Sequence, residues 1–135
     1  MLRAFARFQP AVPLLLRVVL GTIFIAHGFQ KISSGMPEFT RTVAHLGFPM
    51  PVAFAWAAAL SEFLGGICCL VGLFTRWAAL AIAIVMTVAI TKVHLHEGLI
   101  RGYEYELTLL AVAVSIMLMG AGPASLDKNV LHRDF

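Results

Sequence analysis

Residues 52–74 read VAFAWAAALSEFLGGICCLVGLF, an apolar run whose only charged side chain is Glu62. A helix needs about 20 apolar residues to cross a hydrocarbon core about 30 Å thick, so this run is long enough to span a membrane. Three further apolar runs lie at about residues 12–30, 77–96 and 103–121. Because an open strand cannot satisfy its backbone in lipid, all four should be helices. The sequence therefore predicts an all-α protein, an integral membrane four-helix bundle that forms a single transmembrane domain over residues 1–135.

The composition also indicates a membrane protein. The 135 residues are 60% hydrophobic and 13% charged, with a mean hydropathy of +0.89, whereas soluble domains average about 25% charged residues. The ten Lys and Arg residues are scattered singly and form no basic stripe, so nucleic acid is not an expected partner. We expect no metal site, since His94 and His96 would point in different directions from a helix. The lipid bilayer is the expected surrounding.

The segment between the first two spans has a helical pattern of its own. Phe39, Val43 and Leu46 fall at i, i+4 and i+7, with polar residues on the opposite face. This spacing predicts a short amphipathic helix over about residues 37–46. Such a helix is too short to cross the bilayer, so we expect it to lie in the membrane interface or to cover the end of the bundle.

The basic residues of the short loops predict the orientation of the chain. The side that holds both termini would carry more of them than the opposite side. Because basic loops stay in the cytoplasm, both termini are expected there. The residues behind this bias are Arg3, Arg7, Arg76, Lys128 and Arg133.

Polar residues are expected to gather at the non-cytoplasmic face. Spans three and four reach about 22 Å if only uncharged residues are counted, so each must include polar neighbours to cross the bilayer. Those neighbours lie at the face where the first span also ends. The residues of this vestibule are His27, Lys31, Lys92, His94, His96, Tyr103, Glu104, Tyr105 and Glu106. Two simpler interpretations remain open: Lys92, His94 and His96 as the wet end of a helix, and Tyr103 and Tyr105 as part of an aromatic belt.

Two stripes of small and polar residues predict which helix faces point into the bundle. In the first span Arg17, Gly21, Phe24, Gly28 and Lys31 fall within an arc of about 80°. In the fourth span the stripe consists of Glu104, Thr108, Ala111 and Ser115. Small residues let helices approach and charges avoid lipid, so both stripes are expected to face inward.

Glu62 needs a partner, because an unpaired carboxylate in the middle of a span costs several kcal/mol. Counting about 1.5 Å per residue puts Glu62 and Arg17 at depths that differ by about 5 Å, which an Arg side chain can bridge. We therefore predict an ion pair between Arg17 and Glu62. The alternative is that Arg17 extends to the membrane surface.

Several motifs together resemble the DoxX family of small bacterial membrane proteins. They are the pattern R-x-x-x-G-x-x-F-x-x-x-G-x-x-K from Arg17 to Lys31, the stretch EFLGGI from Glu62, and GAGPASLD over residues 120–127. The resemblance implies four membrane helices in the bacterial inner membrane. It also implies a link to redox chemistry, since some members are described as subunits of thiosulfate:quinone oxidoreductase or as membrane partners in sulfur and oxidative-stress chemistry.

Three functions follow as hypotheses. The first is the membrane subunit of a redox system linked to quinone or to sulfur and thiosulfate metabolism, in which Glu62, His94 and Glu104 carry protons and Arg17, His27, Lys31, Lys92 and Tyr103 bind the substrate. The sequence contains no ligand set for haem or an iron–sulfur cluster and no dinucleotide motif, so electrons would come from a bound quinone or a protein redox partner. The second is a non-catalytic membrane anchor or assembly subunit. The third is transport of a small anion, for which a pore would require a homo-oligomer.

Overall fold

The computed structural model describes residues 2–135, which form helices joined by short turns and contain no strand. The α-helices are α1 (Val12–Gln30), α2 (Met36–His45), α3 (Pro51–Val71), α4 (Thr75–Ala89), α5 (Glu104–Met119) and α6 (Leu126–Asn129). The segments η1 (Leu2–Ala11) and η4 (Leu95–Glu97) are 3₁₀ helices, and η2 (Lys31–Gly35) and η3 (Ile90–His94) are π-helical turns. The segment η5 (Leu99–Tyr103) contains a kink, since Ile100, Arg101 and Gly102 have non-helical backbone angles.

Four helical stretches are long and apolar enough to cross a membrane, which confirms the four predicted spans. They cover Leu2–His45, Pro51–Val71, Thr75–Glu97 and Leu99–Met119. The boundaries of α1 match the prediction, but α3 ends at Val71, three residues early. Gly72 and Phe74 have positive φ angles of 73° and 47°, and this left-handed backbone ends α3 and begins α4 directly afterwards.

The segment after the first span continues as a helix. The wide turn η2 carries the chain from α1 into α2 without a loop, and Pro37 lies in the first turn of α2. Val43 is buried and Phe39 and Leu46 are half-buried, so this side of α2 faces the protein. The position of α2 in a membrane interface stays a prediction.

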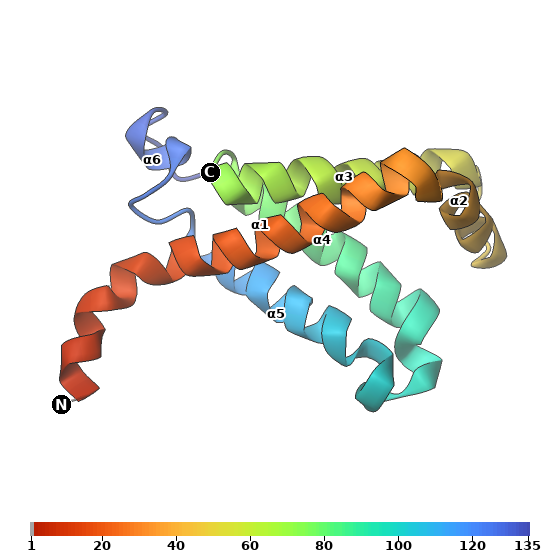
Figure 1. Ribbon diagram of the computed structural model, residues 1–135, viewed down its shortest axis with the longest axis horizontal. Helices are drawn as coiled ribbons and strands as arrows, with labels where there is room; N and C mark the ends of the chain where they lie inside the picture. Colours follow the sequence, from red (N-terminus) through yellow and green to blue (C-terminus); the bar gives the residue numbers. More distant parts are fainter. Residues whose placement is uncertain (1) are drawn as a thin grey trace.

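The most extensive packing joins α1 with α3 and α4 with α5, as Figure 1 shows, and α3 also packs against α4. A Cβ added to Gly21 would lie 2.8 Å from the carbonyl oxygen of Gly66, and one added to Gly28 would lie 2.6 Å from the Cβ of Phe63. Glycine therefore brings the α1 and α3 backbones into contact, as in other membrane helix pairs. The stripe predicted for the first span does face inward, since its Arg, Phe and both Gly residues are buried.

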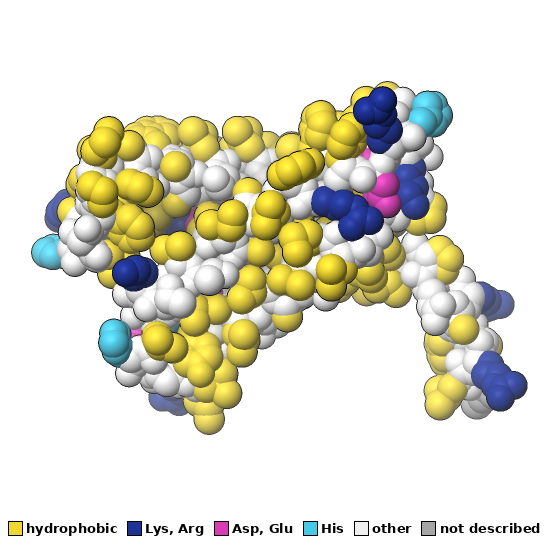
Figure 2. Space-filling view, turned by 180° about the vertical axis from the view of Figure 1, so that it is seen from behind, with side chains coloured by type: hydrophobic (Ala, Val, Ile, Leu, Met, Phe, Trp, Pro, Cys, Tyr) yellow, Lys and Arg dark blue, Asp and Glu magenta, His cyan; other side chains and the backbone are white. Residues whose placement is uncertain are grey.

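The outer surface of the bundle is largely apolar. Figure 2 shows hydrophobic side chains over most of one face, with Lys and Arg gathered toward the ends. Large exposed side chains such as Leu64 and Ile84 lie in the middle of their helices. This distribution suits a protein surrounded by lipid.

The inward face predicted for the fourth span is wrong. Thr108 and Ala111 are exposed, whereas Leu109, Ala113 and Ile116 are the buried residues of α5. The Thr108 hydroxyl donates to the carbonyl oxygen of Glu104 at 2.8 Å, inside the same helix. A hydroxyl satisfied by its own helix needs no partner in the bundle, so apolar packing decides which face of α5 is buried.

Candidate functional site

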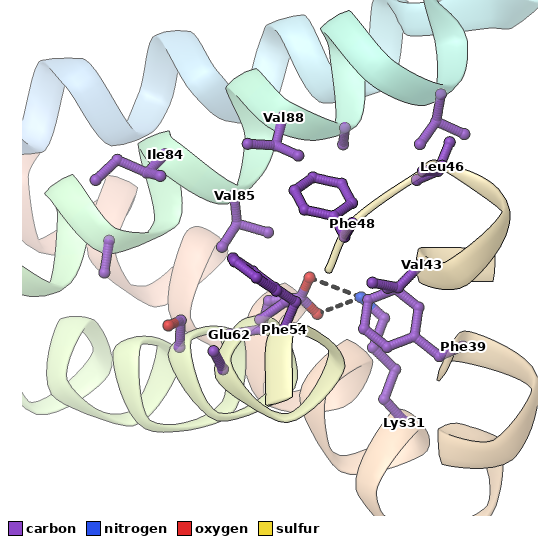
Figure 3. Close-up of a pocket in the computed structure, with 16 residues that line it drawn as sticks. Lys31, Phe39, Val43, Leu46, Phe48, Phe54, Glu62, Ile84, Val85 and Val88 are labelled. Carbon is purple, nitrogen blue, oxygen red and sulfur yellow. Dashed lines mark hydrogen bonds and ion pairs between the residues drawn. The ribbon is translucent and has the colours of Figure 1, made fainter. Parts of the chain in front are cut away.

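Lys31 and Glu62 form an ion pair between the end of α1 and the middle of α3. The Lys31 ammonium donates to both carboxylate oxygens of Glu62, at 2.6 and 2.7 Å. Glu62 is only 2% exposed. The ring of Phe39 on α2 lies 4.4 Å from the same ammonium. Figure 3 shows the two charged side chains pointing toward one another beside this ring.

The sequence produces this pair through the register of the glycine contacts. Gly28 lies against Phe63, and Lys31 follows Gly28 by three residues on the same face of a helix that continues without a break into η2. The contacts run antiparallel, from Gly21 against Gly66 to Gly28 against Phe63, so residues after Gly28 approach residues that precede Phe63, and Lys31 reaches Glu62. The glycine spacing therefore delivers Lys31, and not Arg17, to the buried carboxylate.

A cavity of about 370 Å³ lies beside the ion pair. Lys31, Glu62 and Ser61 are its polar lining residues, and the remaining walls are apolar side chains of α2, α3, α4 and the loop before α3. Those walls include Phe39, Val43, Leu46, Phe48, Phe54, Ile84, Val85 and Val88. Sites for small molecules have volumes of about 300–1,000 Å³ and combine apolar walls with a few polar groups. The cavity thus suits an apolar ligand with one polar end.

The predicted ion pair between Arg17 and Glu62 is wrong. Arg17 is 1% exposed, so it does not extend to the membrane surface either. Its guanidinium donates to four backbone carbonyl oxygens near the opposite end of α3 and in the segment after α5. These are Cys69 at 2.8 Å, Leu70 at 3.1 Å, Ala121 at 2.6 Å and Ala124 at 2.8 Å. Depth counting failed because it ignored this register and the carbonyl groups left free where α3 ends.

Asp127 lies at the same end of the bundle, in a role that the sequence pattern did not predict. Its carboxylate accepts the N–H groups of Phe74 and Thr75, at 2.7 and 2.9 Å, and the Thr75 hydroxyl at 2.8 Å. These bonds cap the first turn of α4, where a negative charge is favourable. The available signal was an Asp in a Gly- and Pro-rich segment, far along the chain from the turn between α3 and α4. This pattern does not identify the helix that the Asp caps.

A second polar cluster lies at the α4–α5 end and outside the cavity lining. His94 contacts Glu97 through Nδ1 at 3.1 Å and Glu106 through Nε2 at 3.2 Å. The Tyr105 hydroxyl lies 3.3 Å from Nε2 of His27. The second carboxylate oxygen of Glu106 is buried with no hydrogen-bond partner among the described residues.

The remaining predicted residues are not brought to the cavity. Lys92 and Glu104 are exposed and Tyr103 is half-buried, and none of the three lines it. Glu104 instead accepts the backbone N–H of Arg101 at 3.2 Å. The predicted vestibule is therefore divided into two groups, one at the Lys31–Glu62 pair and one around His94. The proton-carrying or binding roles of these residues stay predictions. Within residues 2–135, no three His, Cys, Asp or Glu side chains are close enough to hold a metal ion.

Comparisons with known proteins agree with a membrane protein. A family model described as DoxX matches residues 12–95. The chain is 32% identical over 117 residues to a protein of Bacillus subtilis (strain 168) named putative oxidoreductase CatD, covering 87% of this chain and 85% of the relative. It is 26% identical to an uncharacterized membrane protein of Mycobacterium tuberculosis, covering 92% and 84%. It is 35% identical over 72 residues to inner membrane protein YphA of Escherichia coli (strain K12), covering 53% and 51%. No solved structure matches the chain.

Proposed function

Because the chain belongs to the DoxX family, we propose that it is the membrane subunit of a redox system and that it binds a quinone in the cavity beside Lys31 and Glu62. A relative named a putative oxidoreductase, similar over most of both chains, supports the redox class. The observation that carries the choice of ligand is a largely apolar cavity with one buried ion pair in its wall.

The residues of the cavity fit a quinone headgroup. An ammonium has three N–H donors, and Lys31 gives two of them to Glu62, so one remains for a carbonyl oxygen of the ligand. The rings of Phe39, Phe48 and Phe54 offer flat apolar surfaces to a planar ring. The volume of about 370 Å³ is sufficient for such a ring.

The chemistry then divides between the ligand and the chain. A bound quinone supplies an acceptor for two electrons and two protons. Lys31 would hold a carbonyl oxygen and stabilise negative charge that develops on it. Glu62 would hold or release a proton beside the same oxygen. The electrons would come from a protein redox partner, and His94 and Glu104 would exchange protons with the water outside. In this proposal the chain lies in the bacterial inner membrane with both termini in the cytoplasm and α2 in the opposite interface.

A non-catalytic anchor is the second candidate, and the bonding of Arg17 favours it. Four of the five N–H donors of its guanidinium bind backbone carbonyl groups, so this charge serves the assembly of the bundle. If the Lys31–Glu62 pair serves the same purpose, it fixes helix register and nothing else, as some buried ion pairs do.

Quinone binding separates the two candidates. The full chain is purified in lipid nanodiscs, retained quinone is extracted and quantified, and binding of an added ubiquinone analogue is titrated. We expect Lys31→Met and Glu62→Gln to weaken binding at least about tenfold, a loss of roughly 1.4 kcal/mol. Lys128→Met and Glu38→Gln repeat the same chemical changes at exposed positions outside the cavity lining and should bind as the unchanged protein does. Absence of quinone binding in the unchanged, folded protein would reject the redox proposal in favour of the anchor.

A further inference from the structure

The cavity lies where α3 and α4 separate. The two helices are joined by the short turn after Val71 and diverge from it, as Figure 1 shows. Residues of both helices line the cavity on the far side of this turn, and α2 contributes the remaining wall (Figure 3). A space between two diverging membrane helices has two sides through which a ligand can enter, the aqueous end and the lipid.

Depth in the membrane identifies the lipid side. Ile84 lies nine residues after Thr75, or about 14 Å along α4 at about 1.5 Å per residue. Glu62 lies eleven residues after Pro51, about 17 Å along α3, which starts from the opposite face of the membrane. In a hydrocarbon core about 30 Å thick, both positions are close to the midplane and to each other in depth.

The rim of the cavity at this depth is open to the surroundings. Ile84 lines the cavity and is nevertheless 56% exposed. Val88, one turn further along α4, also lines it and is 37% exposed. Since the middle of α4 is surrounded by hydrocarbon, this opening faces lipid tails and not water.

The aqueous end of the cavity is covered. Val43 of α2 is 6% exposed, and the Phe39 ring lies over the Lys31 ammonium. The rings of Phe48 and Phe54 pack with their centroids 5.1 Å apart, which joins the loop before α3 to α3 itself. A water-soluble ligand would have to displace this cover, whereas a lipid-soluble one meets an open rim.

We infer that the ligand enters and leaves sideways from the bilayer, between α3 and α4 past Ile84. Its headgroup lies at the Lys31–Glu62 pair, and its tail lies at the same depth and stays in the surrounding lipid. The ligand class is therefore a quinone with a long alkyl or prenyl tail, and not a water-soluble quinone. This inference rests on the proposed function for the identity of the headgroup and on the cavity alone for the route.

The experiment narrows the opening of the cavity with a larger side chain and compares ligands with and without a tail. Ile84→Trp adds bulk at the exposed rim, and Ile84→Phe adds less. Leu64→Trp is the matched control on the lipid-facing side of α3, because the Leu64 side chain is 52% exposed and does not line the cavity. Three probes are titrated into nanodiscs: a benzoquinone headgroup without a tail, the same headgroup with a decyl tail, and a decyl-bearing phenol that is not a quinone.

We expect Ile84→Trp to weaken binding of the decyl quinone at least about tenfold and to change binding of the tail-less headgroup less than about twofold. Leu64→Trp should leave both unchanged. Equal effects of Ile84→Trp on both quinones, or none on either, would overturn the lateral route while leaving the quinone site in place. If neither quinone binds but the decyl phenol does, and Ile84→Trp removes it, the redox function fails and the route stands. If none of the three probes binds, the route is overturned as well.

Discussion

The Lys31 ammonium lies 2.6 Å from one carboxylate oxygen of Glu62 and 2.7 Å from the other, so a single cation neutralises both acceptor atoms of a carboxylate that is 2% exposed. Removing one partner of a buried pair strands the other charge and typically costs about 3–5 kcal/mol. The cost here should fall below that range, since the Lys31 side chain is 25% exposed. We expect Lys31→Met to lower the free energy of unfolding more than Lys31→Met combined with Glu62→Leu. A thermal unfolding series of the two single variants and the double variant measures this coupling, and additive effects would show that the pair contributes nothing.

Arg17 should not be replaceable by lysine. Its planar guanidinium reaches four carbonyl oxygens in different directions, whereas an ammonium has three donors from one point. Hydrogen bonds to charged groups contribute about 1.5–3 kcal/mol each, so Arg17→Lys should cost at least about 2 kcal/mol. Unfolding in detergent followed by circular dichroism gives the difference. Arg7→Lys is the matched control at an exposed position of η1 and should be neutral; equal stability of the two variants would contradict the prediction.

Gly72 is favoured by its left-handed backbone and by the lack of space for a side chain, and two variants separate these effects. Its φ is 73°, and an added Cβ would lie 2.5 Å from the Cβ of Ser125 and 2.6 Å from the Arg17 guanidinium. Gly47 has a φ of 85° and no heavy atom within 4 Å of an added Cβ. Both Gly→Ala variants carry the left-handed penalty of about 1–2 kcal/mol. Gly72→Ala should cost about 1–3 kcal/mol more than Gly47→Ala because of the steric contact. Similar melting temperatures for the two variants would show that Ser125 and Arg17 move aside at little cost.

Asp127→Asn should destabilise the bundle although it preserves size. The carboxylate uses both oxygens to accept N–H groups of the first turn of α4, and an amide would present a donor to one of them. The lost cap and the buried unpaired donor should cost about 1–3 kcal/mol. Asp134→Asn makes the same change in a partly exposed side chain that pairs with Arg76 at 3.2 Å, and it should cost less than about 1 kcal/mol. Hydrogen exchange at the start of α4 would locate the effect, and unchanged protection there would contradict it.

Hydrophobic length predicted the four spans, and the helical spacing of small and charged residues predicted the inward face of α1, because both are patterns within one segment of the sequence. The partner of Glu62 depended on helix register, and register follows from how closely Gly28 approaches Phe63, which no residue spacing within one helix reveals. Lys31 was predicted to face inward and to bind the substrate, but Arg17 was assigned as the partner of Glu62.

The sequence pattern misled about Thr108 on α5 and about Asp127 in opposite ways. Thr108 looked like a polar residue in need of a partner, yet its own backbone satisfies it. Asp127 looked like part of a polar loop, yet it is fully buried against the turn between α3 and α4. In both cases burial of the side chain depends on which group its hydrogen bond joins. A bond between residues 52 positions apart leaves no local pattern in the sequence.

The bonds of Arg17 also impose an order on biosynthesis. Two of its carbonyl partners come from α3, but Ala121 and Ala124 lie 104 and 107 residues later in the chain. The first helix is therefore synthesised long before all four carbonyl groups exist, and two of the four bonds can form only after α5 has been made. The bonds from Arg17 to the segment around these two alanines are thus the last to form, and they hold α1 in place between the end of α3 and the segment after α5.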